Sequence, residues 1–209
     1  MRCLVLILSL CYLIPVAQAQ EPDPVPADPY GAPVHGVAHH EEMIGQTVPD
    51  VSLAGANGEE VALSSWRGKP VLIDLWATWC SPCLAALPKL NGLYAEIKDK
   101  GMEFVSLDEP GDAADEDKDA ARAAAYLAQH HYNWKNFHDS ESKVASALGC
   151  DGLPLVVLID ANGKIVYFDF GGHEADLRKA IAGLGPEFAS VAPAEERKPD
   201  PSRDSPDQN

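Results

Sequence analysis

Apolar runs and segments of helical periodicity alternate through the middle of this 209-residue chain. The run Val71–Ile73 is typical of a strand buried on both faces, and Phe104–Leu107 and Pro154–Ile159 have the same character. Leu84–Ile97 instead has apolar residues three and four positions apart, which predicts an amphipathic helix directly after the first buried strand. The order strand, helix, strand is typical of an α/β sheet.

Turn signals add the remaining elements. Asn57-Gly58 lies between Val51–Leu53 and Val61–Leu63 and predicts an N-terminal hairpin, and Asp160–Gly163 predicts a second one. The pattern also predicts three further elements, namely a helix at Ala120–His131, a short strand at Trp134–Phe137 and a closing helix at Ala175–Leu184. We therefore predict one α/β domain with a mixed sheet over residues 44–188.

The two ends of the chain differ from this domain. Arg2, the apolar stretch Cys3–Val16 and the small-residue site Ala17–Ala19 predict a secretory signal peptide at residues 1–19. No other apolar stretch approaches the length of a membrane span, so we expect an exported, periplasmic protein without a span after cleavage. Residues 20–43, rich in Pro and His, predict an extended linker, and residues 189–209, acidic and rich in Pro, predict a disordered tail.

The net charge of the chain disfavours some classes of binding partner. The sequence has 16 Lys and Arg against 32 Asp and Glu, a net charge of −16, which disfavours nucleic acid and anionic membrane surfaces. His35, His39 and His40 could bind a metal, but they lie in the predicted linker without fixed geometry. We expect no metal and no cofactor.

Two cysteines stand where the first buried strand meets its helix. Helix N-terminal N–H groups and the helix dipole favour a thiolate at Cys80 and Cys83, and the Cys-x-x-Cys spacing lowers a thiol pKa that is ordinarily about 8.5. Only Cys150 remains after signal cleavage, too few for a four-cysteine zinc site, so we predict thiol–disulfide exchange. Asp74, within the apolar run, should be desolvated, which would raise its pKa above about 3.9. Cys150 is either a small buried apolar residue or a third redox thiol.

Several motifs together resemble those of a known family. They are Gly68-Lys69-Pro70, the segment Asp74–Cys83 with Trp-Cys-x-x-Cys, Gly152-Leu153-Pro154, and Leu158–Asp160 followed by Asn162–Lys164. The chain resembles the thioredoxin superfamily, and within it the exported TlpA/ResA-like thiol:disulfide oxidoreductases. The resemblance implies a three-layer α/β/α thioredoxin fold with a mixed central sheet, an N-terminal hairpin and a helix-plus-strand insertion around residues 109–137.

The resemblance also suggests how the site works. Cys80, nearer the helix start, is the expected nucleophile, and Cys83 then resolves the mixed disulfide, so that the two form the redox disulfide. Asp74 matches the buried acid of thioredoxin and would serve Cys83 as general acid and base.

Three further residues would meet the substrate. The resemblance implies that Pro154 is a cis-proline facing the cysteines, that the backbone of Leu153 accepts an extended substrate segment, and that Trp79 shields the sulfurs. The implied substrates are protein disulfides, apocytochrome c haem-site cysteines among them, with a membrane thiol carrier as electron donor. Because Asp74 matches the acid of thioredoxin, the resemblance favours a reductase, although the sequence does not fix the reduction potential.

Two alternatives have different sequence requirements. A thiol peroxidase of the peroxiredoxin type needs P-x-x-x-T-x-x-C, and Ile73 and Ala77 occupy the Pro and Thr positions. A metal chaperone could use the cysteine pair with a histidine such as His173, although copper-delivery relatives separate their cysteines by three residues instead of two.

Overall fold

The computed structural model describes residues 40–55, 59–111, 116–171 and 173–194. The predicted signal peptide, most of the predicted linker with His35 and His39, and the tail beyond residue 194 lie outside these ranges. Among the helices of the described residues, none has both the length and the apolar character needed to cross a membrane.

A mixed sheet forms the centre of the described domain. Its strands follow the order β2-β1-β5-β4-β3-β6-β7, with β3, β4 and β5 parallel and the others antiparallel to their neighbours. The strands are β1 (Ser52–Gly55), β2 (Glu60–Ala62), β3 (Val71–Trp76), β4 (Glu103–Asp108), β5 (Lys135–His138), β6 (Leu155–Ile159) and β7 (Ile165–Phe170). The predicted hairpins are β1–β2 and β6–β7.

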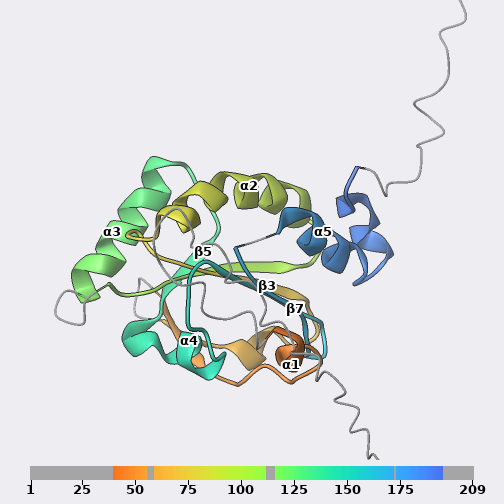
Figure 1. The fold of residues 1–209 in the computed structure, drawn as a ribbon, viewed down its shortest axis with the longest axis horizontal. Coiled ribbons are helices and arrows are strands. Elements are labelled where there is room, and N and C mark those ends of the chain that lie inside the picture. Colours follow the sequence, from red (N-terminus) through yellow and green to blue (C-terminus); the bar gives the residue numbers. More distant parts are fainter. Residues whose placement is uncertain (1–39, 56–58, 112–115, 172, 195–209) are drawn as a thin grey trace, which may run out of the picture. The chain divides into compact units, whose positions relative to one another are not determined.

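Helices cover both faces of this sheet (Figure 1). The helices α2 (Ser81–Ile97), α3 (Glu116–Gln129) and α5 (Glu174–Ala182) contribute to one apolar cluster, which contains Leu72, Trp76 and both cysteines. On the other face lies a second cluster, which includes Val71, Ile73 and residues of the short helix α4 (Lys143–Ala147). Successive strand residues point to opposite faces, so the apolar run of β3 supplies both clusters. The predicted three-layer α/β/α arrangement is confirmed.

The prediction was less accurate at the edges of the domain. Residues 40–43 form the short helix α1 (His40–Met43), so the extended linker predicted to residue 43 ends earlier. At the other end, the 3₁₀ helix η4 (Pro186–Val191) includes three residues assigned to the disordered tail. The Val191 side chain is fully buried and belongs to the cluster around α2 and α5, because apolar contacts continue past Phe188. The domain is therefore slightly longer than residues 44–188.

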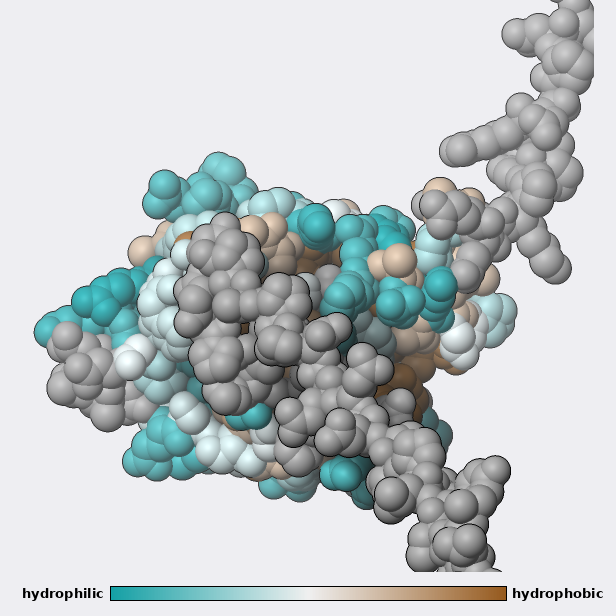
Figure 2. Space-filling view, viewed as in Figure 1, coloured by the Kyte–Doolittle hydropathy of each residue, from teal (hydrophilic) through white to brown (hydrophobic). Residues whose placement is uncertain are grey.

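Inside the domain, some helices and strands begin a few residues away from their predicted positions. Strand β5 begins at Lys135, one residue later than predicted, and α3 begins at Glu116 instead of Ala120. Helix α4 and the 3₁₀ turn before it, η3 (Ser140–Ser142), were not predicted. Hydrophilic residues cover the outer end of α3 (Figure 2), as its acidic sequence would suggest.

Candidate active site

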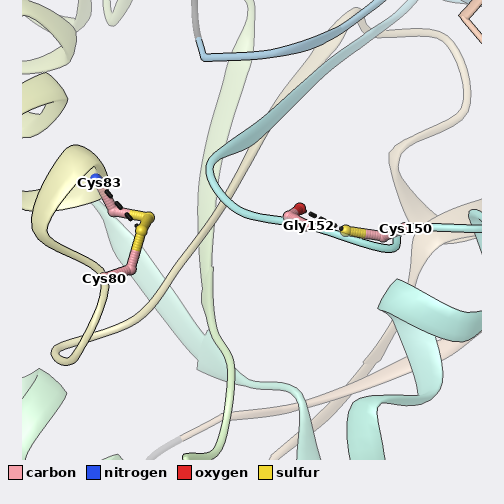
Figure 3. Close-up of a disulfide and its surroundings, with 4 residues drawn as sticks. All are labelled: Cys80, Cys83, Cys150 and Gly152. Atoms are coloured by element: carbon pink, nitrogen blue, oxygen red, sulfur yellow. Dashed lines mark hydrogen bonds between the residues drawn. A yellow bond between two sulfur atoms is a disulfide. The ribbon is translucent and has the colours of Figure 1, made fainter. Parts of the chain in front are cut away.

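The two cysteines begin helix α2 and form a disulfide (Figure 3). Cys80 is the N-cap of the helix, with extended backbone angles, and its Sγ accepts a hydrogen bond of 3.2 Å from the Cys83 N–H. Pro82 lies in the first turn, where a missing N–H costs no intrahelical bond. The chain therefore places one sulfur at the positive end of the helix dipole with a backbone donor directed at it.

Cys80 is slightly more exposed to solvent than Cys83. Cys80 is 5% exposed and Cys83 is 1% exposed, so a substrate sulfur reaches Cys80 more readily. In the reduced protein the helix N-terminus and the Cys83 N–H would stabilise a thiolate on Cys80, and this lowers a thiol pKa. This geometry suits an attacking Cys80 and a resolving Cys83.

Asp74 lies in the middle of β3, between the neighbouring strands β4 and β6. It projects to the same face as Leu72 and Trp76, the face where the cysteine cluster packs. Asp74 is 1% exposed, and its Oδ2 has no hydrogen-bond partner among the described residues. Burial alone raises its pKa from 3.8 to about 7. A carboxyl group with such a pKa can accept and return a proton near neutral pH.

The loop before β6 carries the Leu153–Pro154 peptide, which is cis, as the resemblance implies. The Pro154 carbonyl accepts a hydrogen bond from Gly171. Within the described ranges, neither the N–H nor the C=O of Leu153 has a hydrogen-bond partner, so both can pair with an extended segment. Beside Pro154 lies a small apolar hollow between α2 and α5, lined by Ala86, Lys89, Leu90, Leu93, Pro154, Val156, Glu174 and Leu177.

Trp79 directly precedes the cysteine pair and is 57% exposed, whereas Trp76 is fully buried. A large aromatic side chain that is exposed to water is typical of binding surfaces, because covering it with a partner removes much apolar area from water. Trp79 thus forms the accessible aromatic surface next to Cys80.

Cys150 is half-buried, and its thiol donates a hydrogen bond of 3.0 Å to the Gly152 carbonyl. Figure 3 shows its sulfur directed at that oxygen. Burial is the main cause that raises its thiol pKa to about 11, and the charges of Glu109, Asp151 and Asp139 add to it. This environment disfavours a reactive thiolate, so the structure favours the packing interpretation of Cys150.

Glu109, directly after β4, is a further buried acid, and the family resemblance offers either it or Asp108 as an acid that approaches the cysteines. Its N–H donates to the carbonyl of Trp76, at the end of β3, and its side chain is 7% exposed. Burial, followed by a hydrogen bond with Asp139, raises its pKa to about 8. Asp139 in turn accepts the N–H groups of Val144 and Ala145 and so caps α4. The sequence offered no periodic signal for this contact, because 30 positions separate the two acids.

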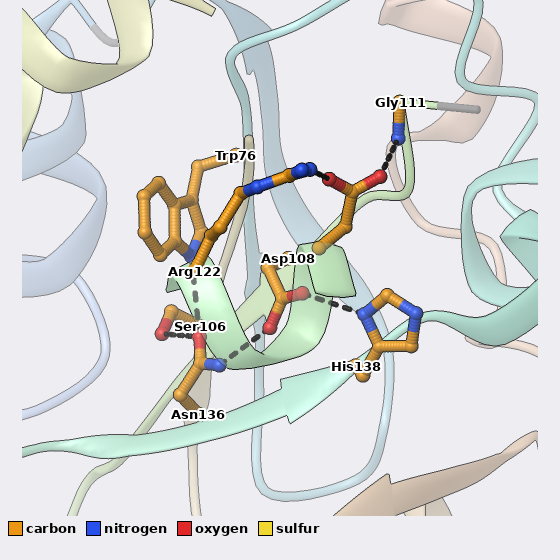
Figure 4. Close-up of polar contacts among 8 residues, drawn as sticks. Trp76, Ser106, Asp108, Gly111, Arg122, Asn136 and His138 are labelled. Atoms are coloured by element: carbon orange, nitrogen blue, oxygen red, sulfur yellow. Dashed lines mark hydrogen bonds and ion pairs between the residues drawn. The ribbon is translucent and has the colours of Figure 1, made fainter. Parts of the chain in front are cut away.

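A second polar cluster lies at the same end of β4 and β5 (Figure 4). Asp108 accepts from Asn136 and pairs with His138, both at 2.6 Å. The Asn136 carbonyl accepts from Ser106 and from the Trp76 indole. Burial raises the pKa of Asp108, and its hydrogen bonds to His138 and Asn136 oppose that rise. These contacts fix the buried Trp76 against the insertion.

The described residues contain no group of three or more His, Cys, Asp or Glu side chains arranged to hold a metal ion. His173, the histidine considered for a metal chaperone, has its Nδ1 2.7 Å from Asp169 Oδ2.

Comparison with known proteins places this geometry in a family. The Redoxin family model matches residues 43–182. The thiol-disulfide oxidoreductase ResA of Bacillus thuringiensis is 33% identical over 130 residues, which span 62% of this chain and 71% of that protein. ResA of Geobacillus thermodenitrificans is 32% identical over 122 residues, or 58% and 66% of the two chains.

Solved structures agree with this result. A thiol:disulfide interchange protein, DsbE, from Chlorobium tepidum is 34% identical with a TM-score of 0.59, and the match covers 68% of this chain and 98% of that one. The fold, the cysteine pair at the start of α2 and the matched length lead to one conclusion. This chain belongs to the redoxin family of thioredoxin-fold proteins.

Proposed function

We propose that this protein is an exported thiol–disulfide oxidoreductase that reduces protein disulfides through Cys80 and Cys83. The observation that carries the proposal is the cysteine pair at the α2 N-terminus, with the Cys83 N–H directed at Cys80 Sγ. The similarity to ResA and DsbE supports the same chemistry.

The reaction begins with the reduced protein. The Cys80 thiolate attacks one sulfur of the substrate disulfide, the substrate S–S bond breaks, and the second substrate sulfur leaves as a thiolate that takes up a proton. The Cys83 thiol then loses its proton and attacks Cys80 Sγ, which releases the first substrate sulfur. The substrate gains two electrons and two protons, and the protein is left with the Cys80–Cys83 disulfide.

Asp74 is the proposed base in the second step. Cys83 is almost fully buried, so its proton needs an acceptor on the protein side of the disulfide. Asp74 lies on the cysteine-facing side of β3, and its pKa of about 7 allows it to take the proton of Cys83 and return it to the departing substrate thiolate.

The finer assignments rest on the sequence. The signal-peptide pattern at residues 1–19 supports export to the periplasm, where a membrane thiol carrier would re-reduce the Cys80–Cys83 disulfide. Candidate substrates are the haem-site cysteines of apocytochrome c, held as an extended segment against Leu153, Pro154 and Trp79.

Trapping the mixed disulfide tests the proposal. In Cys83→Ala the second step cannot occur, so covalent adducts through Cys80 should accumulate in the cell envelope and resolve on treatment with dithiothreitol. Cys150→Ala is the matched control, and it should reduce insulin at the wild-type rate. Absence of adducts together with absence of insulin reduction by the wild-type protein would refute the assignment.

The direction of electron flow has its own measurement. Equilibrating the Cys80–Cys83 pair with glutathione gives its reduction potential, and a reductase should be more reducing than the glutathione couple of about −240 mV. A potential close to the −120 mV typical of a strong oxidant would refute the reducing role while leaving the exchange chemistry intact.

A further inference from the structure

The loop after β4 lies against the active-site tryptophan. A Cβ atom added to Gly111 would lie 2.8 Å from Trp79 Cδ1, closer than real Cβ atoms come, and 3.0 Å from Nε1, which is tighter than most real Cβ contacts. Gly111 does not have a positive φ, so its backbone conformation does not require glycine. The close approach of the indole is therefore the reason that a side chain does not fit here.

Two backbone hydrogen bonds, from the N–H groups of Glu109 and Gly111, hold this loop in place. The Glu109 N–H donates to the Trp76 carbonyl at 2.8 Å, which ties the loop to the end of β3. Two residues later, the Gly111 N–H donates to Asp119 Oδ2 at 2.8 Å (Figure 4). Asp119 comes from the first turns of α3, is 6% exposed, and pairs through Oδ1 with Arg122. A buried carboxylate thus holds the Gly111 backbone in place.

We propose that Gly111 and Asp119 are positioning residues for Trp79. The Asp119 carboxylate keeps the Gly111 backbone against one side of the indole, and the other side forms the aromatic surface that a protein substrate contacts beside Cys80. A fixed indole costs less conformational entropy on substrate binding than a mobile one. The inference rests on the proposed function for its effect on substrate, but not for the contact itself.

Substitution of Gly111 tests the contact. In Gly111→Ala the new methyl group displaces the indole, so the Trp79 Nε1–H resonance should shift in a ¹⁵N spectrum of the oxidised protein. The chain has 4 tryptophans, and the missing signal in Trp79→Phe identifies the one to follow. Gly92→Ala in α2 is the matched control, because an added Cβ there has no atom within 4 Å. It should leave the resonance unmoved.

Kinetics test the consequence. For reduction of insulin, Gly111→Ala should raise KM about fivefold, equivalent to a contact worth about 1 kcal/mol, with kcat retained. Asp119→Ala should raise KM in the same way, while Asp119→Asn keeps an acceptor oxygen and should restore most of the wild-type value. Because Gly111 acts through Trp79, Gly111→Ala should have no additional effect on KM in a Trp79→Ala background.

The outcomes separate the two proposals. An unmoved Trp79 resonance in Gly111→Ala overturns the positioning role, and so does an effect on KM that persists in Trp79→Ala. If the wild-type protein reduces no disulfide, the proposed function fails and the substrate part of this inference fails with it. The resonance shift would then still decide whether the loop positions the indole.

Discussion

Replacement of Asp74 by Asn should make the oxidised protein more stable, and the gain should depend on pH. Asp74 is buried among apolar side chains without a hydrogen bond to Oδ2 in the described part of the chain, so its ionised form is disfavoured. The folded state raises its pKa above the value of the unfolded chain. Folded protein therefore binds more protons at Asp74 than unfolded protein does, and the contribution of Asp74 to stability falls as pH rises.

The structure sets the size of this effect. The pKa rises from 3.8 to about 7, and each pH unit between these values corresponds to about 1.4 kcal/mol at 25 °C. Below pH 3.8 Asp74 is protonated in both states and its contribution is fully present. Between pH 4 and pH 7 the wild-type protein loses about 4 kcal/mol relative to the Asn variant, and above pH 7 the difference is constant.

Urea unfolding of both proteins, with the disulfide intact, measures this difference in the free energy of unfolding. The series should run from pH 3.5 to pH 8.5, because this range brackets the ordinary pKa of 3.8 and the raised pKa of about 7. Subtracting the two free energies at each pH removes the titration of every other group that the substitution leaves unchanged, Glu109 included. The difference should rise from about pH 4 and level off near pH 7. A difference that stays flat across this range would refute the desolvation argument, and with it the case for Asp74 as a base near neutrality.

Three further predictions concern residues around the site. Glu109→Gln should stabilise the protein increasingly as pH rises toward 8, because burial and Asp139 raise the pKa of Glu109 to about 8. If variant and wild type differ in their free energy of unfolding by the same amount at pH 5 and at pH 8, this prediction is wrong. Cys150 in the reduced protein should resist iodoacetamide at pH 8 while Cys80 reacts, which mass spectrometry can follow. Arg178→Met removes hydrogen bonds to Glu96, Glu174 and the Val191 carbonyl and should lower the free energy of unfolding by about 1–2 kcal/mol.

The parts of the fold that sequence predicted best are those with a local cause. The apolar run of β3, the periodicity of α2 and the cysteines between them are contiguous, so strand, helix start and sulfur position follow from the single stretch Val71–Ile97. The burial of Asp74 could be inferred in the same way from its apolar neighbours on both sides. The cis peptide before Pro154 came only from the resemblance, since an isolated proline does not reveal its isomer.

The missed features depend on residues distant in sequence. Helix α4 has five residues and is capped by Asp139, so its pattern is too short to show periodicity. The 3₁₀ helix η4 lies in a stretch with few large apolar residues, yet Val191 is buried because α2 and α5 provide a surface for it. Pro110-Gly111 indicates a turn, but the requirement for a small residue at position 111 comes from Trp79, 32 positions earlier, and no local pattern reveals it.

The three buried acids on β3 and at the end of β4 are not equivalent, and this difference favours Asp74 for proton transfer. Asp108 accepts from Asn136 and pairs with His138, so protonating it would break existing contacts. Burial, a hydrogen bond with Asp139 and the charge of Asp139 raise the pKa of Glu109, and Asp139 also caps α4, so ionising Glu109 would place its charge beside that of Asp139 in a buried site. The pKa of Asp74 is raised by burial alone, and among the described residues its titration disrupts no hydrogen bond to Oδ2. Asp74 can therefore gain and lose a proton during each turnover without rearranging the fold that holds the cysteines.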